Sequence, residues 1–312
     1  MDLNSFIGHE SIKLQIEYSI RAGMVSHAHL IVGEDGIGKS FIAKALALKI
    51  LGKTEDKQYA DIDEYRVLKG KQSIGVDEIR DIIEEISKKP YESDKKVVIL
   101  YEADSMTDQA QNAFLKTIEE PPNNVFIILI CENLEAILDT IRSRCQIHKL
   151  YRLSNEDIVR FLKRDFPDLS AEESRTALTF SDGIPGRAVK FINDEVLKAT
   201  RNLMLDILIS SQKKEKSEFI KYDNLLTKNK DYKEVLTWIV SYVRDTLVYK
   251  ETGNIDLIVN IDKAQLIKEL AGMFSFIKLN DIIDIVNYTR MNLERNVNST
   301  ATFDIMLIKI QK

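Results

Sequence analysis

A glycine-rich segment that ends in Lys39 and Ser40 contains the residue types that bind the phosphates of a nucleotide. Its sequence, Gly-Glu-Asp-Gly-Ile-Gly-Lys-Ser, has the spacing of a phosphate-binding loop. Gly33, Gly36 and Gly38 would let backbone N–H groups approach phosphate oxygens at the start of a helix. In such a loop Lys39 reaches the β- and γ-phosphates, and the Ser40 hydroxyl is a ligand of Mg²⁺. The segment therefore predicts a site for ATP and Mg²⁺; the alternative is a strand-to-helix turn that binds nothing.

The elements expected around this loop are those that an α/β domain uses to position one. Apolar runs predict strands over residues 28–32, 96–101, 125–130 and 147–150. The first of these strands ends directly before the loop. Periodic apolar positions predict helices between them, over residues 41–51, 74–86 and 108–119. The polar stretch 53–65 is expected to be a loop. Because strands alternate with helices, we expect an α/β P-loop domain with a mostly parallel sheet over residues 1–150.

The rest of the chain has a helical pattern. Capping residues open helices at Ser154 and Ser170, and a Gly-Ile-Pro-Gly break precedes a helix near Arg187. These features predict a small helical domain over residues 151–208. An all-α domain is expected over residues 209–312, and it contains an apolar stripe that we expect in its core, formed by Val235, Trp238, Ile239, Tyr242 and Val243. The lysine-rich run at 213–216 is expected to be a linker or a solvated helix end.

Composition excludes several classes of function. The 312 residues are 44% hydrophobic and 30% charged, which is typical of a soluble globular protein. No apolar run approaches the roughly 18 residues of a membrane span, and the N-terminus has no signal-peptide pattern. The net charge is −5, and no lysine and arginine cluster marks a stand-alone nucleic-acid binder. Two cysteines and four histidines, without Cys-x-x-Cys spacing, predict no zinc site and a reducing, cytoplasmic location.

Taken together, the motifs resemble those of the AAA+ proteins that form bacterial sliding-clamp loaders. These complexes place the ring-shaped clamp of the replicative polymerase on DNA. The resemblance extends to about residue 190 and is most specific in two runs, Asn112 to Pro122 (Asn-Ala-Phe-Leu-Lys-Thr-Ile-Glu-Glu-Pro-Pro) and Ser143-Arg144-Cys145. It implies a P-loop domain, a small helical lid over 151–208 and a helical collar over 209–312 that binds partner subunits.

Two departures from the family pattern indicate the kind of subunit. Motor subunits carry a four-cysteine zinc module after the P-loop helix, whereas residues 52–68 contain no cysteine. The resemblance also places Tyr101 where motors have the aspartate that holds the Mg²⁺ shell, with Glu102 in place of the glutamate that polarises the attacking water. Starting the acidic box at Glu102 instead would slip the strand by one residue and lose the downstream match. A phenol with a pKa of about 10 adds no anion for the metal.

The resemblance also implies roles for residues outside the loop. Arg144 would project across a subunit interface to the γ-phosphate of a neighbour, where a guanidinium stabilises the transferring phosphoryl group; the alternative is a surface arginine in a salt bridge. Cys131 stands where AAA+ proteins have a polar sensor of nucleotide, and its thiol is a weak donor. Arg187 matches the second sensor, with a first-turn surface residue as the alternative. Ile7 and Gly8 would line the adenine pocket.

These features favour a stator-like clamp-loader subunit that binds ATP, hydrolyses it weakly or not at all, and donates Arg144. Its expected partners are motor and delta-like subunits, with the clamp and primer-template DNA reached through the complex. Two alternatives remain. One is an ATP-hydrolysing motor subunit of the same machine, against which Tyr101 and the missing cysteines count. The other is an unrelated AAA+ ATPase such as a branch-migration helicase or a transcriptional activator, against which the 112–122 run counts.

Overall fold

The computed structural model describes residues 3–55, 57–68, 70–213, 232–295 and 297–311. They form two compact units. The first comprises the chain up to Phe166 together with Ser181–Gly186, and the second comprises Pro167–Phe180 and the chain from Arg187 onwards. Each unit is described by itself below. The finer division into three domains, with boundaries after residues 150 and 208, stays a prediction.

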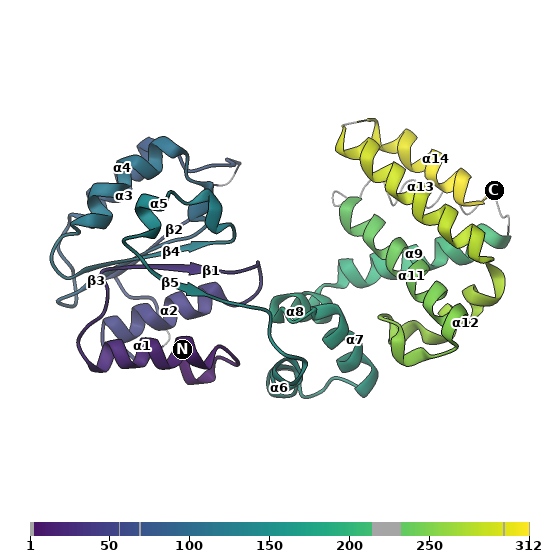
Figure 1. Cartoon of the computed structure of the whole chain (residues 1–312), viewed down its shortest axis with the longest axis horizontal. Coiled ribbons are helices and arrows are strands. Elements are labelled where there is room, and N and C mark those ends of the chain that lie inside the picture. The colour runs from purple at the N-terminus through teal and green to yellow at the C-terminus, as the bar shows by residue number, and fades with distance from the viewer. Residues whose placement is uncertain (1–2, 56, 69, 214–231, 296, 312) are drawn as a thin grey trace. The chain divides into compact units, whose positions relative to one another are not determined.

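A five-stranded parallel sheet forms the centre of the first unit (Figure 1). Its strands are β1 (Ala28–Val32), β2 (Ile62–Tyr65), β3 (Lys96–Leu100), β4 (Val125–Cys131) and β5 (Gln146–Lys149), in the spatial order β2-β3-β4-β1-β5. Every neighbouring pair runs parallel. Because all carboxyl ends then meet at one edge of the sheet, the loops after β1, β3 and β4 come together there. The predicted α/β class and four of the five strands are confirmed.

Helices cover both faces of the sheet, as Figure 1 shows. One face, with Leu30 and Val98, packs against α3 (Val76–Ile86) and α4 (Asp108–Glu119). The opposite face, with Ile31, packs against α1 (Glu10–Arg21) and α2 (Lys39–Ile50). Strands buried on both faces are continuous apolar runs, which is why β1, β3 and β4 were visible in the sequence.

The expectation of a loop over the whole of 53–65 is wrong, because β2 occupies its end. Its sequence, Ile-Asp-Glu-Tyr, lacks the continuous apolar character of the central strands. The strand lies at the edge of the sheet, pairs only with β3, and has no fully buried residue. Apolar periodicity therefore gave no signal for a polar edge strand of four residues.

The second unit is helical. It contains α7 (Ala171–Ser181, of which Ser181 belongs to the first unit), most of α8 (Pro185–Asn193), and five helices further on: α9 (Glu195–Lys213), α11 (Tyr232–Thr252), α12 (Ala264–Met273), α13 (Phe276–Glu294) and α14 (Ser299–Gln311). α11 packs against α9, α12 and α13. The apolar stripe predicted for the core is at most 3% exposed, which confirms that prediction. The lysine run 213–216 lies, after Lys213, outside the described residues. None of the described helices is both long and apolar enough to cross a membrane.

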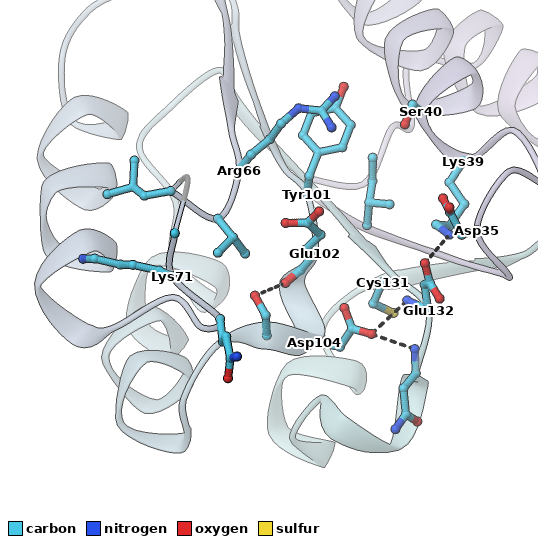
Figure 2. A pocket seen from close by; sticks show the side chains of 17 residues that line it. Asp35, Lys39, Ser40, Arg66, Lys71, Tyr101, Glu102, Asp104, Cys131 and Glu132 are labelled. Carbon is cyan, nitrogen blue, oxygen red and sulfur yellow. Dashed lines mark hydrogen bonds and ion pairs between the residues drawn. The ribbon is translucent and has the colours of Figure 1, made fainter. Parts of the chain in front are cut away.

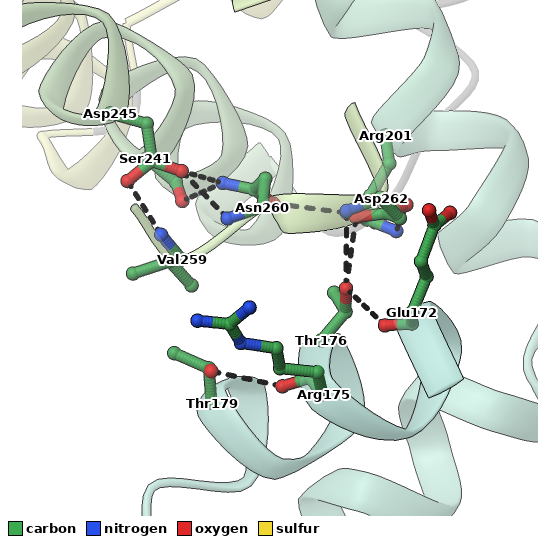
Figure 3. A network of polar contacts seen from close by, with 10 residues as sticks. All are labelled: Glu172, Arg175, Thr176, Thr179, Arg201, Ser241, Asp245, Val259, Asn260 and Asp262. Atoms are coloured by element: carbon green, nitrogen blue, oxygen red, sulfur yellow. Dashed lines mark hydrogen bonds and ion pairs between the residues drawn. The ribbon is translucent and has the colours of Figure 1, made fainter. Parts of the chain in front are cut away.

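A buried polar network connects the helices of the second unit (Figure 3). Arg201 on α9 is 3% exposed, and its guanidinium donates to Asp262 at 3.0 and 3.2 Å and to the Asn260 side chain at 3.0 Å. Asn260 in turn donates to the buried Asp245 on α11, at 2.7 Å. Asp262 also contacts the hydroxyl of Thr176 on α7, at 3.3 Å. Because each buried charge has partners, the network ties α7, α9 and α11 together without an unpaired ion.

Candidate nucleotide site and arginine motif

The glycine-rich loop joins β1 to α2 in a conformation that two of its glycines require. Gly36 and Gly38 have φ angles of 79° and 108°, in a region that other residues rarely adopt. A Cβ at Gly38 would also lie 2.5 Å from the Phe6 ring, so the N-terminal segment packs directly against the loop. The strand, turn and helix expected around the loop are therefore all present, and the backbone is shaped to receive phosphates at the start of α2.

The tip of the loop packs against residues 184–186 of the same unit. The Gly186 N–H donates to the Gly36 carbonyl at 2.9 Å, and a Cβ at Gly186 would lie only 2.6 Å from the Gly36 Cα. The Arg152 guanidinium holds the loop from the side: it donates twice to the Glu34 carboxylate, at 2.6 and 2.8 Å, and also pairs with Asp182. The conformation of the loop is thus fixed by contacts that are distant in the sequence.

Lys39 folds back onto its own loop. Its Nζ donates to the carbonyls of Gly33 at 2.7 Å and Glu34 at 3.0 Å, and lies 3.8 Å from Glu132 Oε1. The residue is 8% exposed, so its charge is held close to the place where the N–H groups of the loop converge. Ser40 follows it and is exposed. A phosphate chain would meet both side chains at the beginning of α2.

A cavity of about 720 Å³ opens beside the loop at the carboxyl edge of the sheet (Figure 2). Four of the residues that the sequence nominated line it together: Lys39, Ser40, Glu102 and Cys131. The other lining residues come from the loop, from the segment after β2 and from the ends of β3 and β4, and they include Asp35, Arg66, Lys71, Tyr101, Asp104, Glu132 and Asn133. The cavity therefore joins the phosphate-binding loop to the positions after β3 and β4.

Tyr101 directly follows β3 and is 3% exposed. Its hydroxyl donates to Glu64 at 2.8 Å, and Glu64 also pairs with Lys44 on α2 at 2.9 Å. Burial alone would raise the pKa of Glu64, but the hydrogen bonds from Lys44 and Tyr101 outweigh burial and lower that pKa. Burial, together with the Glu64 carboxylate, raises the pKa of Tyr101. The phenol is thus a neutral donor, and it adds no metal-binding charge beside Ser40.

The acidic residues after Tyr101 lie in different environments. Glu102 is exposed, has a left-handed backbone with φ of 53°, and lines the cavity. Asp104 accepts hydrogen bonds from the backbone N–H groups of Glu132 and Asn133, at 3.0 and 2.8 Å. Asp104 therefore fixes the turn after β4. The Glu102 carboxylate, like that of Asp35 on the loop, lines the cavity without a hydrogen bond or ion pair among those found in the described residues.

Cys131 is the last residue of β4, is 1% exposed and lines the cavity. Burial raises the pKa of its thiol to about 12, so the group is neutral. A neutral thiol can only donate weakly to a phosphate oxygen. In the described part of the chain, no group of three or more His, Cys, Asp or Glu side chains is arranged to hold a metal ion.

The residues nominated for the adenine pocket and for the second sensor, Ile7, Gly8 and Arg187, do not line the cavity. Gly8 has a φ of 80°, and a Cβ there would lie 2.5 Å from the Leu153 side chain, so the Ile7-Gly8 segment packs near the start of α6 (Asn155–Asp165). Arg187 lies half-buried in the first turn of α8, at the point where the chain enters the second unit. The residue before it, Gly186, is the one that contacts the loop tip.

Arg144 lies between α5 (Asp139–Arg142) and β5, two residues before that strand begins. Because the strands are parallel, it is at the amino edge of the sheet, opposite the edge where the cavity opens. Its side chain is 39% exposed, and the guanidinium pairs with Glu119 at 2.7 Å and donates to the Thr140 carbonyl at 2.8 Å. The side chain therefore cannot serve the cavity of its own unit, and it remains accessible from outside.

Sequence reasoning assigned no role to Arg66, Glu119 or Arg152. Arg66 follows the edge strand β2, which the sequence did not reveal. Glu119 lies within the 112–122 run, but that run assigned it no function. Arg152 holds Glu34 across 118 residues of sequence, and nothing local signals such a contact.

Two family profiles match the chain: "DNA polymerase III, delta subunit" over residues 8–154, and "DNA polymerase III, delta subunit, C terminal" over residues 195–311. The DNA polymerase III subunit delta' of Escherichia coli (strain K12) is 28% identical over 312 residues, covering 94% of this chain and 91% of that protein. The subunit tau of Bacillus subtilis (strain 168) is 27% identical over 345 residues, covering 97% of this chain and 60% of that protein. A gamma subunit-related protein of Thermotoga maritima has the same fold, with a TM-score of 0.53 at 18% identity, over 95% of this chain and 99% of that chain.

Proposed function

Because the chain belongs to the DNA polymerase III delta-subunit family of clamp-loader proteins, we propose that it is a stator subunit of the delta-prime type. In this proposal its own site binds ATP with little or no turnover, and Arg144 acts in the site of a neighbouring ATPase subunit. The position of Arg144 at the sheet edge opposite its own cavity carries the proposal.

The donated arginine has a defined chemical task. A guanidinium presents planar, paired N–H donors that match the oxygens of a transferring phosphoryl group. Removing such a residue costs about 10³–10⁵ in rate in well-studied systems. Arg144 is exposed enough to reach a partner, yet it is held by Glu119 and Thr140 in its own chain. A residue held in this way loses little freedom when a neighbour's phosphate binds.

The chain's own site fits a phosphate chain better than it fits catalysis. Gly36 and Gly38 open the loop, Lys39 supplies positive charge and the Ser40 hydroxyl is available to Mg²⁺. The metal would supply further neutralisation of the phosphates when bound. Tyr101, however, stands in place of the carboxylate that would hold the Mg²⁺ shell. Glu102 would therefore have to polarise the attacking water without that second acid. Slow or absent hydrolysis is the expected result.

The remaining nominated residues would report on the nucleotide. Cys131 would donate weakly to a phosphate oxygen from the end of β4. Arg187 would approach the phosphates in cis, a role supported by the contact between its neighbour Gly186 and Gly36. Ile7 and Gly8 would contact adenine through apolar and backbone groups.

The proposed setting is the cytoplasm, in a complex with motor and delta-like subunits. The helical region over 209–312 would form the collar that binds them, and 151–208 the lid. The sliding clamp and primer-template DNA would be reached through that complex. We propose no zinc module for this subunit.

A direct test measures binding and turnover by the isolated chain. Calorimetry with ATP should detect binding that is lost in Lys39→Ala, because that change removes the charge under the phosphates. Phosphate release by the same preparation should stay at the level of the Lys39→Ala control. Robust turnover by the wild type would assign the chain to the motor class, and undetectable binding would make the loop a structural remnant.

A further inference from the structure

Tyr101 occupies the position expected for the carboxylate that holds the Mg²⁺ shell, and a cationic side chain covers it. The Arg66 guanidinium lies over the Tyr101 ring, with its Cζ 3.6 Å from the ring centroid (Figure 2). On the other side Tyr101 donates to Glu64, whose carboxylate also pairs with Lys44. The Glu64 carboxylate is therefore already engaged. The wall of the cavity where a Mg²⁺ shell would be held presents a phenol and a guanidinium.

The other acidic side chains of the cavity restore little of the missing metal site. Asp104 is occupied by two backbone N–H groups, and Glu132 lies 3.8 Å from the Lys39 ammonium. Asp35 lies on the loop itself, and Glu102 projects from an exposed, left-handed position. Mg²⁺ in nucleotide sites needs one or two protein carboxylates in near-octahedral geometry. Glu102 directly follows Tyr101 in the lining, so its substitution tests for such a role.

A guanidinium at this place has two consequences. It repels a divalent cation, and it can pair with the phosphate oxygens that such a cation would otherwise neutralise. Stacking on Tyr101 orients the planar group, which reduces the entropy lost on binding a phosphate. Lys39 and Arg66 would then act on the same phosphate chain from different walls of the cavity.

We propose that Arg66 is a phosphate-binding residue that replaces Mg²⁺ in this site, so that nucleoside triphosphate binds nearly as well without the metal as with it. The inference rests on the proposed nucleotide binding and deepens it. It also supplies a physical reason for slow turnover, since nucleotide bound without the metal would lack the ion that bridges the β- and γ-oxygens in phosphoryl transfer.

The test is calorimetric titration of the full-length protein with ATP, in excess Mg²⁺ and in EDTA. We expect dissociation constants that agree within about threefold, whereas a site built around the metal would lose about tenfold or more in EDTA. Arg66→Gln should weaken binding in EDTA by about tenfold or more, because a charge-assisted hydrogen bond is lost. Arg66→Lys should recover part of the lost affinity, because lysine keeps the positive charge but lacks the planar, paired donors of a guanidinium.

Two controls separate the explanations. Arg80→Gln removes an exposed arginine on α3 that pairs with Asp77 outside the cavity lining, and it should leave both affinities unchanged. Melting temperatures of all variants exclude loss of fold. Binding that requires Mg²⁺ and is lost in Glu102→Gln would overturn the inference while leaving nucleotide binding intact. Absence of binding in both buffers would overturn the proposed nucleotide site itself, and the inference with it.

Discussion

Arg144 and Glu119 form an ion pair of 2.7 Å between the segment before β5 and the end of α4. Both side chains remain partly exposed, at 39% and 43%. Exposed pairs contribute little to stability, about 0–1 kcal/mol. The value of this pair is therefore positional: together with the Thr140 carbonyl it fixes where the guanidinium points.

Arg144→Ala should leave the fold and the ATP affinity of the isolated chain intact, because the side chain is far from its own cavity. Turnover at the neighbouring site that the proposal assigns to Arg144 should fall by about 10³-fold. The DNA- and clamp-stimulated ATPase of the whole complex should fall only in part, since other sites keep their own arginines. Lysine should rescue poorly. The measurement compares reconstituted complexes at equal assembly, and an unchanged rate would make Arg144 an ordinary surface residue.

Glu119→Gln should lower the same activity less than Arg144→Ala does, because the arginine remains but is less well held. The loss should appear in the maximal rate of the complex rather than in its apparent affinity for ATP. The double variant should behave like Arg144→Ala alone, since Glu119 acts through the arginine. A loss in the double variant equal to the sum of the two single losses would show that Glu119 has a separate role.

Gly186→Ala should disturb the loop from outside it. The new Cβ would lie 2.6 Å from the Gly36 Cα, so backbone must move, at a cost of about 1–3 kcal/mol. We expect weaker ATP binding in calorimetry and a lower melting temperature. Gly272→Ala in α12 is the matched control: its Cβ would meet nothing within 4 Å, and helix propensity predicts a gain of about 0.5–1 kcal/mol. Equal effects of both substitutions would contradict the proposed contact.

Acidification should weaken the fold through a buried histidine pair. His29 Nδ1 and His148 Nε2 lie 3.1 Å apart on β1 and β5, and both residues are 1% exposed. Burial, with a smaller effect of His148, lowers the pKa of His29 to about 3, and burial lowers the pKa of His148 to about 4. Unfolded histidines titrate near 6.5. Between that value and the folded pKa values the unfolded state binds more protons, so stability is complete above pH 6.5 and is lost as pH falls.

The loss should approach about 1.4 kcal/mol per pH unit for each histidine below pH 6. Urea denaturation at pH 7.5 and pH 5.5 measures it in the wild type and in a His29→Leu/His148→Leu variant. The variant should lose much less stability between the two pH values. A slope that survives the double substitution would assign the acid sensitivity to other groups.

The network of Figure 3 predicts a contrast between two arginines of the second unit. Arg201→Met leaves Asp262, 20% exposed, without its main partner and should cost about 3–5 kcal/mol. Arg175 also pairs with an aspartate, Asp256, but both side chains are about half-exposed or more, at 47% and 68%. Arg175→Met should therefore cost no more than about 1 kcal/mol. Chemical denaturation of both variants is the measurement, and similar losses would contradict the burial argument.

Local sequence was sufficient wherever local physics decides structure. The loop between an apolar strand and a helix was predictable because Gly36 and Gly38 must adopt positive φ and Lys39 and Ser40 must follow them. β3 and β4 were visible since strands buried on both faces are apolar throughout. The stripe from Val235 to Val243 was visible through its helical period.

Tertiary structure decided what local patterns do not encode. β2 is a strand only because β3 lies beside it, and Arg66 reaches the Tyr101 ring only because those two strands are neighbours. Arg152 donates a hydrogen bond to Glu34, which is 118 residues away in the sequence. The order of the strands also sets Arg144 at the edge opposite the cavity. Contacts between distant residues depend on topology, and the alternation of apolar residues along one strand does not specify which strand will lie next to it.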